Sequence, residues 1–119
     1  MVEMIKKEYG NYLLNIFENK DEIYSFLSNE IINNILETLN NKNRFQLCLC
    51  GGSTPKKLYD RLSKELIPWN KVDIFLGDER CVGPDSNDSN SLMVKSHLLK
   101  NFGSKAYFYQ IFNNSEIDE

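Results

Sequence analysis

The chain has 119 residues, of which 41% are hydrophobic and 26% charged, a composition typical of one small globular domain and not of a disordered or fibrous chain. With 14 basic and 17 acidic side chains, its formal net charge is −3. It therefore lacks the broad positive field that attracts proteins to nucleic acid or anionic membranes, and we expect neither as a partner. The sequence contains no apolar run of about 18 residues and no signal-peptide pattern, which argues against a membrane span or secretion.

The first part of the chain is predicted to form a strand and a long helix. The run from Tyr12 to Phe17 (YLLNIF) has the apolar character of a strand, and residues 18–21 supply turn and N-cap side chains. Beyond them, apolar residues recur at intervals of three and four, which predicts one stripe of a helix about five turns long. These residues are Ile23, Phe26, Leu27, Ile31, Ile35, Leu36 and Leu39.

A second strand, a glycine turn and a second helix are predicted next. The run from Phe45 to Cys50 is nearly all apolar and ends at Gly51-Gly52, a pattern that predicts a central parallel strand buried on both faces. Pro55 suits the first position of a helix that we expect to stop at Pro68. The predicted apolar stripe of this helix is Leu58, Tyr59, Leu62 and Leu66.

The last part of the chain is predicted to add a strand at 71–76, a polar segment at 78–87, a helix at about 88–100 and a short strand at 106–112. The resulting βαβαβαβ order predicts an α/β fold with a Rossmann-like, open, mostly parallel sheet and helices on both faces. Such a sheet usually needs more strands than this length provides. We therefore expect residues 1–119 to form a single α/β domain that is incomplete, with a polar tail at 113–119.

The cysteines are three in number, Cys48, Cys50 and Cys81, and the first two lie in the apolar run. They are interpreted as free thiols, with the first two buried, in a reducing compartment, which predicts a cytoplasmic protein. A zinc site built from these cysteines and His97 is disfavoured because their spacing is not that of known zinc motifs. We therefore expect no metal.

The loop Gly51-Gly52-Ser53-Thr54 is the first candidate site. In open α/β sheets ligands bind beyond the carboxyl ends of the strands, and this loop leads from such a strand into a helix N-terminus. Glycines allow close backbone approach and the hydroxyls of Ser53 and Thr54 add donors, so the loop suits a phosphate monoester. The alternative is an ordinary turn with an N-cap residue. The loop matches neither the P-loop nor the dinucleotide fingerprint, which argues against ATP and NAD.

The segment Asp78-Glu79-Arg80 is the second candidate. Three consecutive charges at the end of a buried strand are costly unless they meet solvent, partners or a ligand. Arg80 is suited to clamp an oxyanion through two hydrogen bonds, while Asp78 and Glu79 are suited to hold loops, orient Arg80 or bond substrate hydroxyls. The alternative is a solvated loop with local ion pairs. The following Ser89-Asn90 is by itself an ordinary N-cap signature.

Three segments together resemble the amino-terminal half of the 6-phosphogluconolactonase family, over about residues 20 to 112. They are L-C-L-C-G-G-S-T-P-x-x-L-Y (47–59), P-W-x-x-V-x-I-F-L-G-D-E-R-C-V (68–82) and D-S-N-x-x-M (88–93). The related glucosamine-6-phosphate deaminases share the first type of loop but typically have D-E-Y where this chain has D-E-R at 78–80. The resemblance therefore favours the lactonase. Cys50 departs from the pattern, since the family usually has serine there.

The resemblance implies hydrolysis of 6-phospho-D-glucono-1,5-lactone to 6-phosphogluconate, in the pentose phosphate pathway, without a cofactor. It implies that Gly51, Gly52, Ser53, Thr54 and Arg80 bind the 6-phosphate of this small sugar-phosphate lactone. It also implies a supporting role in the substrate pocket for Asp78, Glu79 and Asn90.

The family's general-base histidine lies in a later G-x-x-x-D-G-H-type motif, which this chain does not contain. No catalytic residue is thus identified, His97 is interpreted as a partly exposed helix residue, and we expect the chain alone to be inactive. The alternatives are a non-catalytic sugar-phosphate-binding remnant and, less favoured, an amino-sugar-phosphate isomerase or deaminase. A sheet cut partway would leave an edge or an apolar face, which predicts self-association or pairing with the missing carboxy-terminal half.

Overall fold

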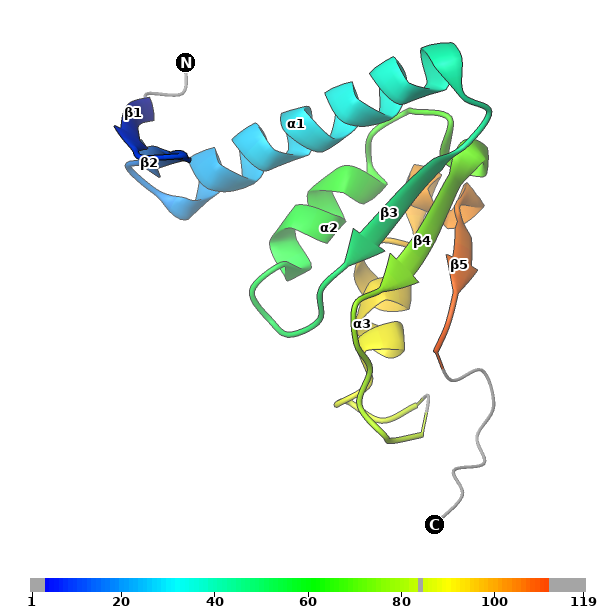
Figure 1. The fold of residues 1–119 in the computed structure, drawn as a ribbon. Helices are drawn as coiled ribbons and strands as arrows, with labels where there is room; N and C mark the ends of the chain where they lie inside the picture. The colour runs from blue at the N-terminus through cyan, green and yellow to red at the C-terminus, as the bar shows by residue number, and fades with distance from the viewer. Residues whose placement is uncertain (1–3, 84, 112–119) are drawn as a thin grey trace.

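The structure is a computed structural model that describes residues 4–83 and 85–111. An antiparallel hairpin, β1 (Met4–Tyr9) and β2 (Tyr12–Phe17), is followed by the long helix α1 (Lys20–Asn41). The rest of the described chain alternates strands and helices: β3 (Phe45–Leu49), α2 (Lys56–Ser63), β4 (Val72–Leu76), α3 (Asn90–His97) and β5 (Tyr107–Tyr109) (Figure 1). Two 3₁₀ turns, Trp69–Lys71 and Asn101–Lys105, precede β4 and β5.

The three strands β3, β4 and β5 form a parallel sheet in that order. Leu47 lies opposite Ile74, which lies opposite Phe108, so these side chains share one face of the sheet. The helices connect parallel neighbours, as crossover units do. The predicted α/β class with a parallel sheet is therefore confirmed.

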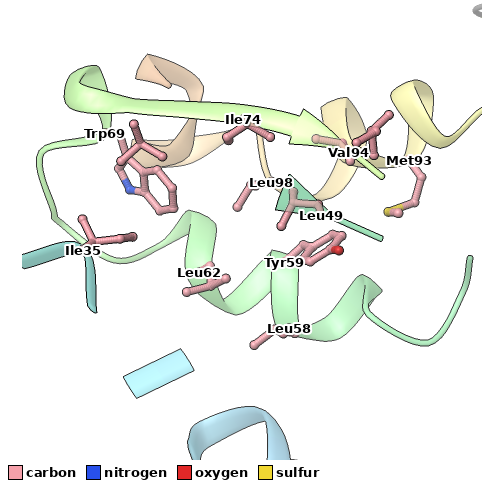
Figure 2. Packing of buried hydrophobic residues seen from close by; sticks show 12 residues of the cluster. Ile35, Leu49, Leu58, Tyr59, Leu62, Trp69, Ile74, Met93, Val94 and Leu98 are labelled. Carbon is pink, nitrogen blue, oxygen red and sulfur yellow. The ribbon is translucent and has the colours of Figure 1, made fainter. Parts of the chain in front are cut away.

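The hydrophobic core lies between the helices and the face of the sheet that carries Leu47, Ile74 and Phe108. Ile35 of α1, Leu62 of α2, Val94 of α3 and Ile74 of β4 are all fully buried in this core (Figure 2). Trp69 is 1% exposed, and its indole Nε1–H donates to the Glu65 carbonyl at 2.9 Å. The core therefore fixes the positions of β3, β4 and the helices that follow them. The two candidate loops connect these strands to these helices.

Helix α1 begins where the sequence predicts. The Asn19 side chain caps it by accepting from the backbone N–H of Glu22 at 3.0 Å, and the Glu22 carboxylate accepts from the N–H of Glu18 at 3.2 Å. Such reciprocal capping satisfies N–H groups that lack intrahelical partners. The expected apolar stripe is only partly buried, since Ile23 and Leu36 remain 36% and 44% exposed. No helix among the described residues is both long and apolar enough to cross a membrane.

The hairpin corrects one prediction. Residues 12–17 form a strand as expected, but this strand pairs antiparallel with β1 and is not part of the parallel sheet. The turn uses Gly10, whose φ is 57°, a left-handed conformation that favours glycine. The sheet of the described chain therefore starts at β3.

Strand β3 corrects a second prediction. Among the described strands it lies at an edge of the sheet, and β4 is central. Cys48 and Cys50 are exposed, not buried, because the face of the sheet that carries Cys48 has no helix packed on it in the described part of the chain. The apolar run is thus half-buried, with alternate side chains facing outward.

Two helix ends and the last strand also differ from prediction. Helix α2 stops at Ser63, and Leu66 lies beyond it with 78% of its side chain exposed, so Leu66 does not belong to the stripe. Helix α3 spans only Asn90–His97 of the predicted 88–100. Strand β5 ends at Tyr109; the predicted strand end at 112 and the tail at 113–119 lie outside the described residues.

Candidate functional site

The two candidate loops leave the carboxyl ends of neighbouring strands. The first follows β3 and leads into α2, and the second follows β4 and leads towards α3. The N–H of Gly77 donates to the Leu49 carbonyl at 2.9 Å, which continues the pairing of β3 and β4 to the point where the loops begin. The loops therefore start side by side, at the edge where ligands bind in open α/β sheets.

Gly51 and Asn90 hold the two loops together. The Asn90 side chain lies so close to Gly51 that a Cβ at position 51 would overlap its amide group. The Asn90 amide donates to the carbonyl and to the carboxylate Oδ1 of Asp78, at 3.2 and 3.3 Å. A glycine at 51 is thus required by close approach, whereas Gly52 adopts a φ of 86° that L side chains rarely tolerate.

Glu79 caps helix α3 from eleven residues upstream. Its carboxylate accepts from the backbone N–H groups of Asn90 at 2.6 Å and Ser91 at 2.8 Å, and also from that of Arg80 at 2.8 Å. Burial raises the pKa of this carboxyl, but the hydrogen bonds outweigh burial and lower the pKa below its usual value. Glu79 thus fixes the loop that carries Arg80 against the start of α3, and its supporting role in a substrate pocket stays a prediction.

A cavity of about 230 Å³ lies between the two loops. Its lining brings together Ser53 and Arg80, two of the residues predicted to bind phosphate, and adds the ammonium-bearing side chain of Lys56. One carboxylate, that of Asp88, also lines it, against two cations. The complete lining is Gly52, Ser53, Lys56, Arg80, Asn87, Asp88, Ser89, Asn90 and Met93.

Thr54 and Gly51 are not part of this lining. Thr54 lines a neighbouring cavity of about 410 Å³ together with Lys57 of α2 and three residues of α1, Lys20, Ile23 and Tyr24. Ser53 lines both cavities. Asn87 and Asp88 line the first cavity but were not predicted as site residues. Asp88 begins the D-S-N-x-x-M segment at 88–93, which is a sequence signal for it. For Asn87 the only signal is its polar character in a loop that follows a strand, and many loops share that character.

His97 lies at the end of α3 and is absent from the cavity lining. Its Nδ1 is 2.9 Å from Oδ1 of Asp60, and Nζ of Lys100 is 2.8 Å from the same oxygen. Burial raises the pKa of the Asp60 carboxyl, but these two partners lower this pKa by more than burial raises it, so the net shift is downward. With 28% of its side chain exposed, His97 is the partly exposed helix residue that the sequence predicts.

The described residues bring no three His, Cys, Asp or Glu side chains into a group that could bind a metal ion. Cys50 instead neighbours Tyr59, whose hydroxyl donates to the Cys50 carbonyl at 2.7 Å. Burial, followed by the hydrogen bond with the Cys50 thiol, raises the pKa of Tyr59 well above its usual value. Tyr59 therefore ties the start of the first loop to helix α2.

Comparison with known proteins places this chain in a family. A model of the family described as glucosamine-6-phosphate isomerases/6-phosphogluconolactonase matches residues 18–119. The 6-phosphogluconolactonase of Rhizobium meliloti (strain 1021) is 31% identical over 106 residues, which are 89% of this chain and 46% of that protein. That of Nostoc sp. (strain PCC 7120 / SAG 25.82 / UTEX 2576) is 42% identical over 69 residues, which are 58% of this chain and 29% of that protein.

Solved structures of proteins with that name also match this chain. The crystal structure of a 6-phosphogluconolactonase from Shewanella baltica OS155 matches with a TM-score of 0.79 and 36% sequence identity, over 82% of this chain and 42% of that chain. The chain thus spans less than half the length of each of these three relatives.

Proposed function

Because the chain belongs to the glucosamine-6-phosphate isomerase/6-phosphogluconolactonase family, we propose that it carries the phosphate-binding part of a 6-phosphogluconolactonase. In this proposal residues 1–119 form the amino-terminal portion of a lactonase-like domain. The substrate is 6-phospho-D-glucono-1,5-lactone, and the product is 6-phosphogluconate. The relatives that match the chain are named for this activity, and the chain carries Asp78-Glu79-Arg80, the D-E-R form of the second motif.

The observation that carries the proposal is the cavity between the two loops. Ser53 provides a hydroxyl just before α2, and Arg80 and Lys56 provide two positive charges at the same cavity. A helix N-terminus and a guanidinium group are both suited to a dianionic phosphate. Lys56 in the first turn opposes the helix dipole, so an anion bound there would relieve an otherwise unfavourable charge.

Hydrolysis of the lactone adds water to the C1 carbonyl and breaks the bond from C1 to the ring oxygen, which takes up a proton. The reaction needs an activated water molecule and a stabiliser for the developing oxyanion. In our proposal the described residues contribute binding energy and orientation through the 6-phosphate, and Asp78 and Asn90 fix the pocket. No histidine among the described residues lines the cavity, so the general base is proposed to come from another part of the family domain.

The proposed compartment is the cytoplasm. All three cysteines of this chain are exposed free thiols, a state that a reducing compartment maintains.

Binding of 6-phosphogluconate to the purified chain, followed by calorimetry, tests the proposal. Replacing Arg80 by Gln removes a charge-assisted pair that contributes about 1.5–3 kcal/mol, so we expect binding to weaken by about 10- to 100-fold. Ser53→Ala should weaken it less, because a neutral hydrogen bond contributes only about 0.5–1.5 kcal/mol.

Arg61→Gln is the matched control. Arg61 is an exposed arginine on α2 that lines a different cavity, so its loss changes the net charge equally without touching the site. Gluconate, which lacks the phosphate, should bind none of the proteins. Equal weakening by Arg80→Gln and Arg61→Gln, or equal binding of gluconate, would refute the proposed site.

A further inference from the structure

A second cavity, of about 410 Å³, lies between the starts of α1 and α2, next to the cavity that contains Arg80. The two helices pack side by side (Figure 1), so residues far apart in the sequence meet there. Its volume is within the range of about 300–1,000 Å³ that is usual for small-molecule sites. The lining of this second cavity is Lys20, Ile23, Tyr24, Ser53, Thr54 and Lys57.

The lining of the second cavity is positively charged. It contains the ammonium-bearing side chains of Lys20 and Lys57 and no carboxylate, and Asp21 lines a neighbouring cavity that shares Tyr24 and Lys57. In the part of the chain that the structure describes, neither lysine forms an ion pair. Each lies in the first turn of its helix, where the helix dipole disfavours a cation. An anion bound beside both lysines would relieve these unfavourable interactions.

Apolar side chains lie beside these charges. Tyr24 is partly buried and packs against the hydrophobic core, which holds its side chain in place, and Ile23 is 36% exposed. Together they give the second cavity an aromatic and an aliphatic wall, whereas the cavity that contains Arg80 has no aromatic side chain in its lining. The two cavities therefore differ in the kind of molecule that they suit.

We propose that the second cavity binds a phosphate monoester that carries an aromatic ring, the class to which nucleoside monophosphates belong. The phosphate lies beside Lys20 and Lys57 and accepts hydrogen bonds from the hydroxyls of Ser53 and Thr54. The ring lies against Tyr24. A monophosphate needs neither of the glycine-rich motifs that hold di- and triphosphates. The proposal rests on the second cavity alone, so it and the proposed lactone site can fail separately.

The test is a titration of the ¹⁵N-labelled chain with adenosine 5′-monophosphate, followed by NMR. We expect saturable shifts of the backbone N–H signals of Tyr24, Thr54 and Lys57. Adenosine lacks the phosphate and ribose 5-phosphate lacks the ring. Each should bind at least about 10-fold more weakly, because a charge-assisted hydrogen bond and stacking on an aromatic side chain each contribute about that factor.

Three variants of the lining should weaken the binding of adenosine 5′-monophosphate. Lys57→Gln should do so by about 10-fold, through the lost charge-assisted bond. Tyr24→Leu should also do so by about 10-fold but leave the binding of ribose 5-phosphate unchanged, because it removes only the ring contact. Ile23→Asp alters an exposed position and places a carboxylate in the same lining, so it should weaken both by repulsion. Circular dichroism checks that each variant folds.

Lys42→Gln is the matched control, because Lys42 follows the last turn of α1 and lines a different cavity. It changes the net charge equally and should leave binding unchanged. Arg80→Gln separates the two cavities and should also leave the binding of adenosine 5′-monophosphate unchanged. The proposal is overturned if Arg80→Gln or Lys42→Gln weakens this binding as much as Lys57→Gln does. It is equally overturned if no saturable shift occurs, or if adenosine or ribose 5-phosphate binds as tightly as the nucleotide.

Discussion

Replacing Gly51 by Ala should strongly destabilise the chain through Asn90. The added Cβ would overlap the Asn90 amide, which is 5% exposed and donates to Asp78. Overpacking costs about 1–3 kcal/mol, and a lost hydrogen bond about 0.5–1.5 kcal/mol. We therefore expect a total of about 1.5–4.5 kcal/mol. A chain of 119 residues lies between the sizes for which each kcal/mol lowers the Tm by about 4–8 °C and by about 2–4 °C, so we expect about 4 °C for each kcal/mol.

The assay is urea unfolding of the wild type, Gly51→Ala, Asn90→Ala and the double variant, at low micromolar concentration. In the double variant the smaller side chain at 90 leaves room for the new methyl group, so the two effects should be far from additive. Gly83→Ala is the control, because a Cβ at 83 would meet nothing within 4 Å and no left-handed φ is involved. If Gly51→Ala costs no more than Gly83→Ala, or if the two effects simply add, the proposed contact between the loops does not exist.

Three further predictions concern the cap, the loop tether and catalysis. The pKa of Glu79 is lowered in the folded state. Its contribution to stability is therefore present above its ordinary pKa of about 4.3 and is lost as the pH falls through the folded value. When melts are compared from pH 5 to pH 3, Glu79→Gln should thus lose less stability than the wild type. Tyr59→Phe should cost about 0.5–1.5 kcal/mol in urea unfolding through the lost bond to the Cys50 carbonyl. It should leave the number of tyrosines that ionise near pH 10, read at 295 nm, unchanged. The purified chain should hydrolyse the lactone no faster than buffer, and His97→Ala should change nothing.

Each of these has a result that contradicts it. An unchanged acid slope in Glu79→Gln would assign the whole slope to other carboxyls such as Asp60 and Asp73, whose pKa values are also lowered. Loss of one tyrosine from the titration near pH 10 in Tyr59→Phe would mean that its pKa is not raised. Rapid lactone hydrolysis that His97→Ala abolishes would make His97 catalytic. It would contradict the interpretation of His97 as a helix residue that only contacts Asp60.

The helices and the parallel strands could be predicted because local signals agree with the tertiary fold. Asn19 caps α1 and Ser89 caps α3, as residue preferences indicate. Pro55, expected at the first position of α2, lies one residue before it. β1 was missed because its residues MIKKEY are mostly charged or polar. The Gly10-Asn11 pair between β1 and β2, a known hairpin signal, was the cue for it.

The burial of β3 could not be read from its sequence. Cysteines count as small hydrophobes, so Cys48 and Cys50 made an alternating, half-buried strand look fully buried. Whether a face is covered depends on the whole sheet and not on one strand. The predicted end of α2 at Pro68 is wrong, because the chain leaves the helix after Ser63 and Leu66 faces solvent.

The candidate site, too, could be predicted only in part from the sequence. The glycine turn and Arg80 could be named as candidates from local sequence, although an ordinary turn and a solvated loop were equally open there. The structure brings Ser53 and Arg80 to one cavity, and phosphate binding by these residues stays a prediction. The role of Glu79 as a cap of α3, and the need for Gly51 beneath Asn90, depend on contacts across eleven and thirty-nine positions of the chain. The sequence alone identifies these residues as candidates, but only the fold shows which groups each of them contacts.

The most direct test of phosphate binding between the two loops is a titration of the ¹⁵N-labelled chain with 6-phosphogluconate, followed by NMR. The account predicts saturable shifts of the backbone N–H signals of Gly52 and Ser53 and of the Arg80 side-chain Nε–H, with one common Kd and no response of Arg61. Saturable shifts confined to other residues, or equal shifts at Arg61 and Arg80, would contradict it.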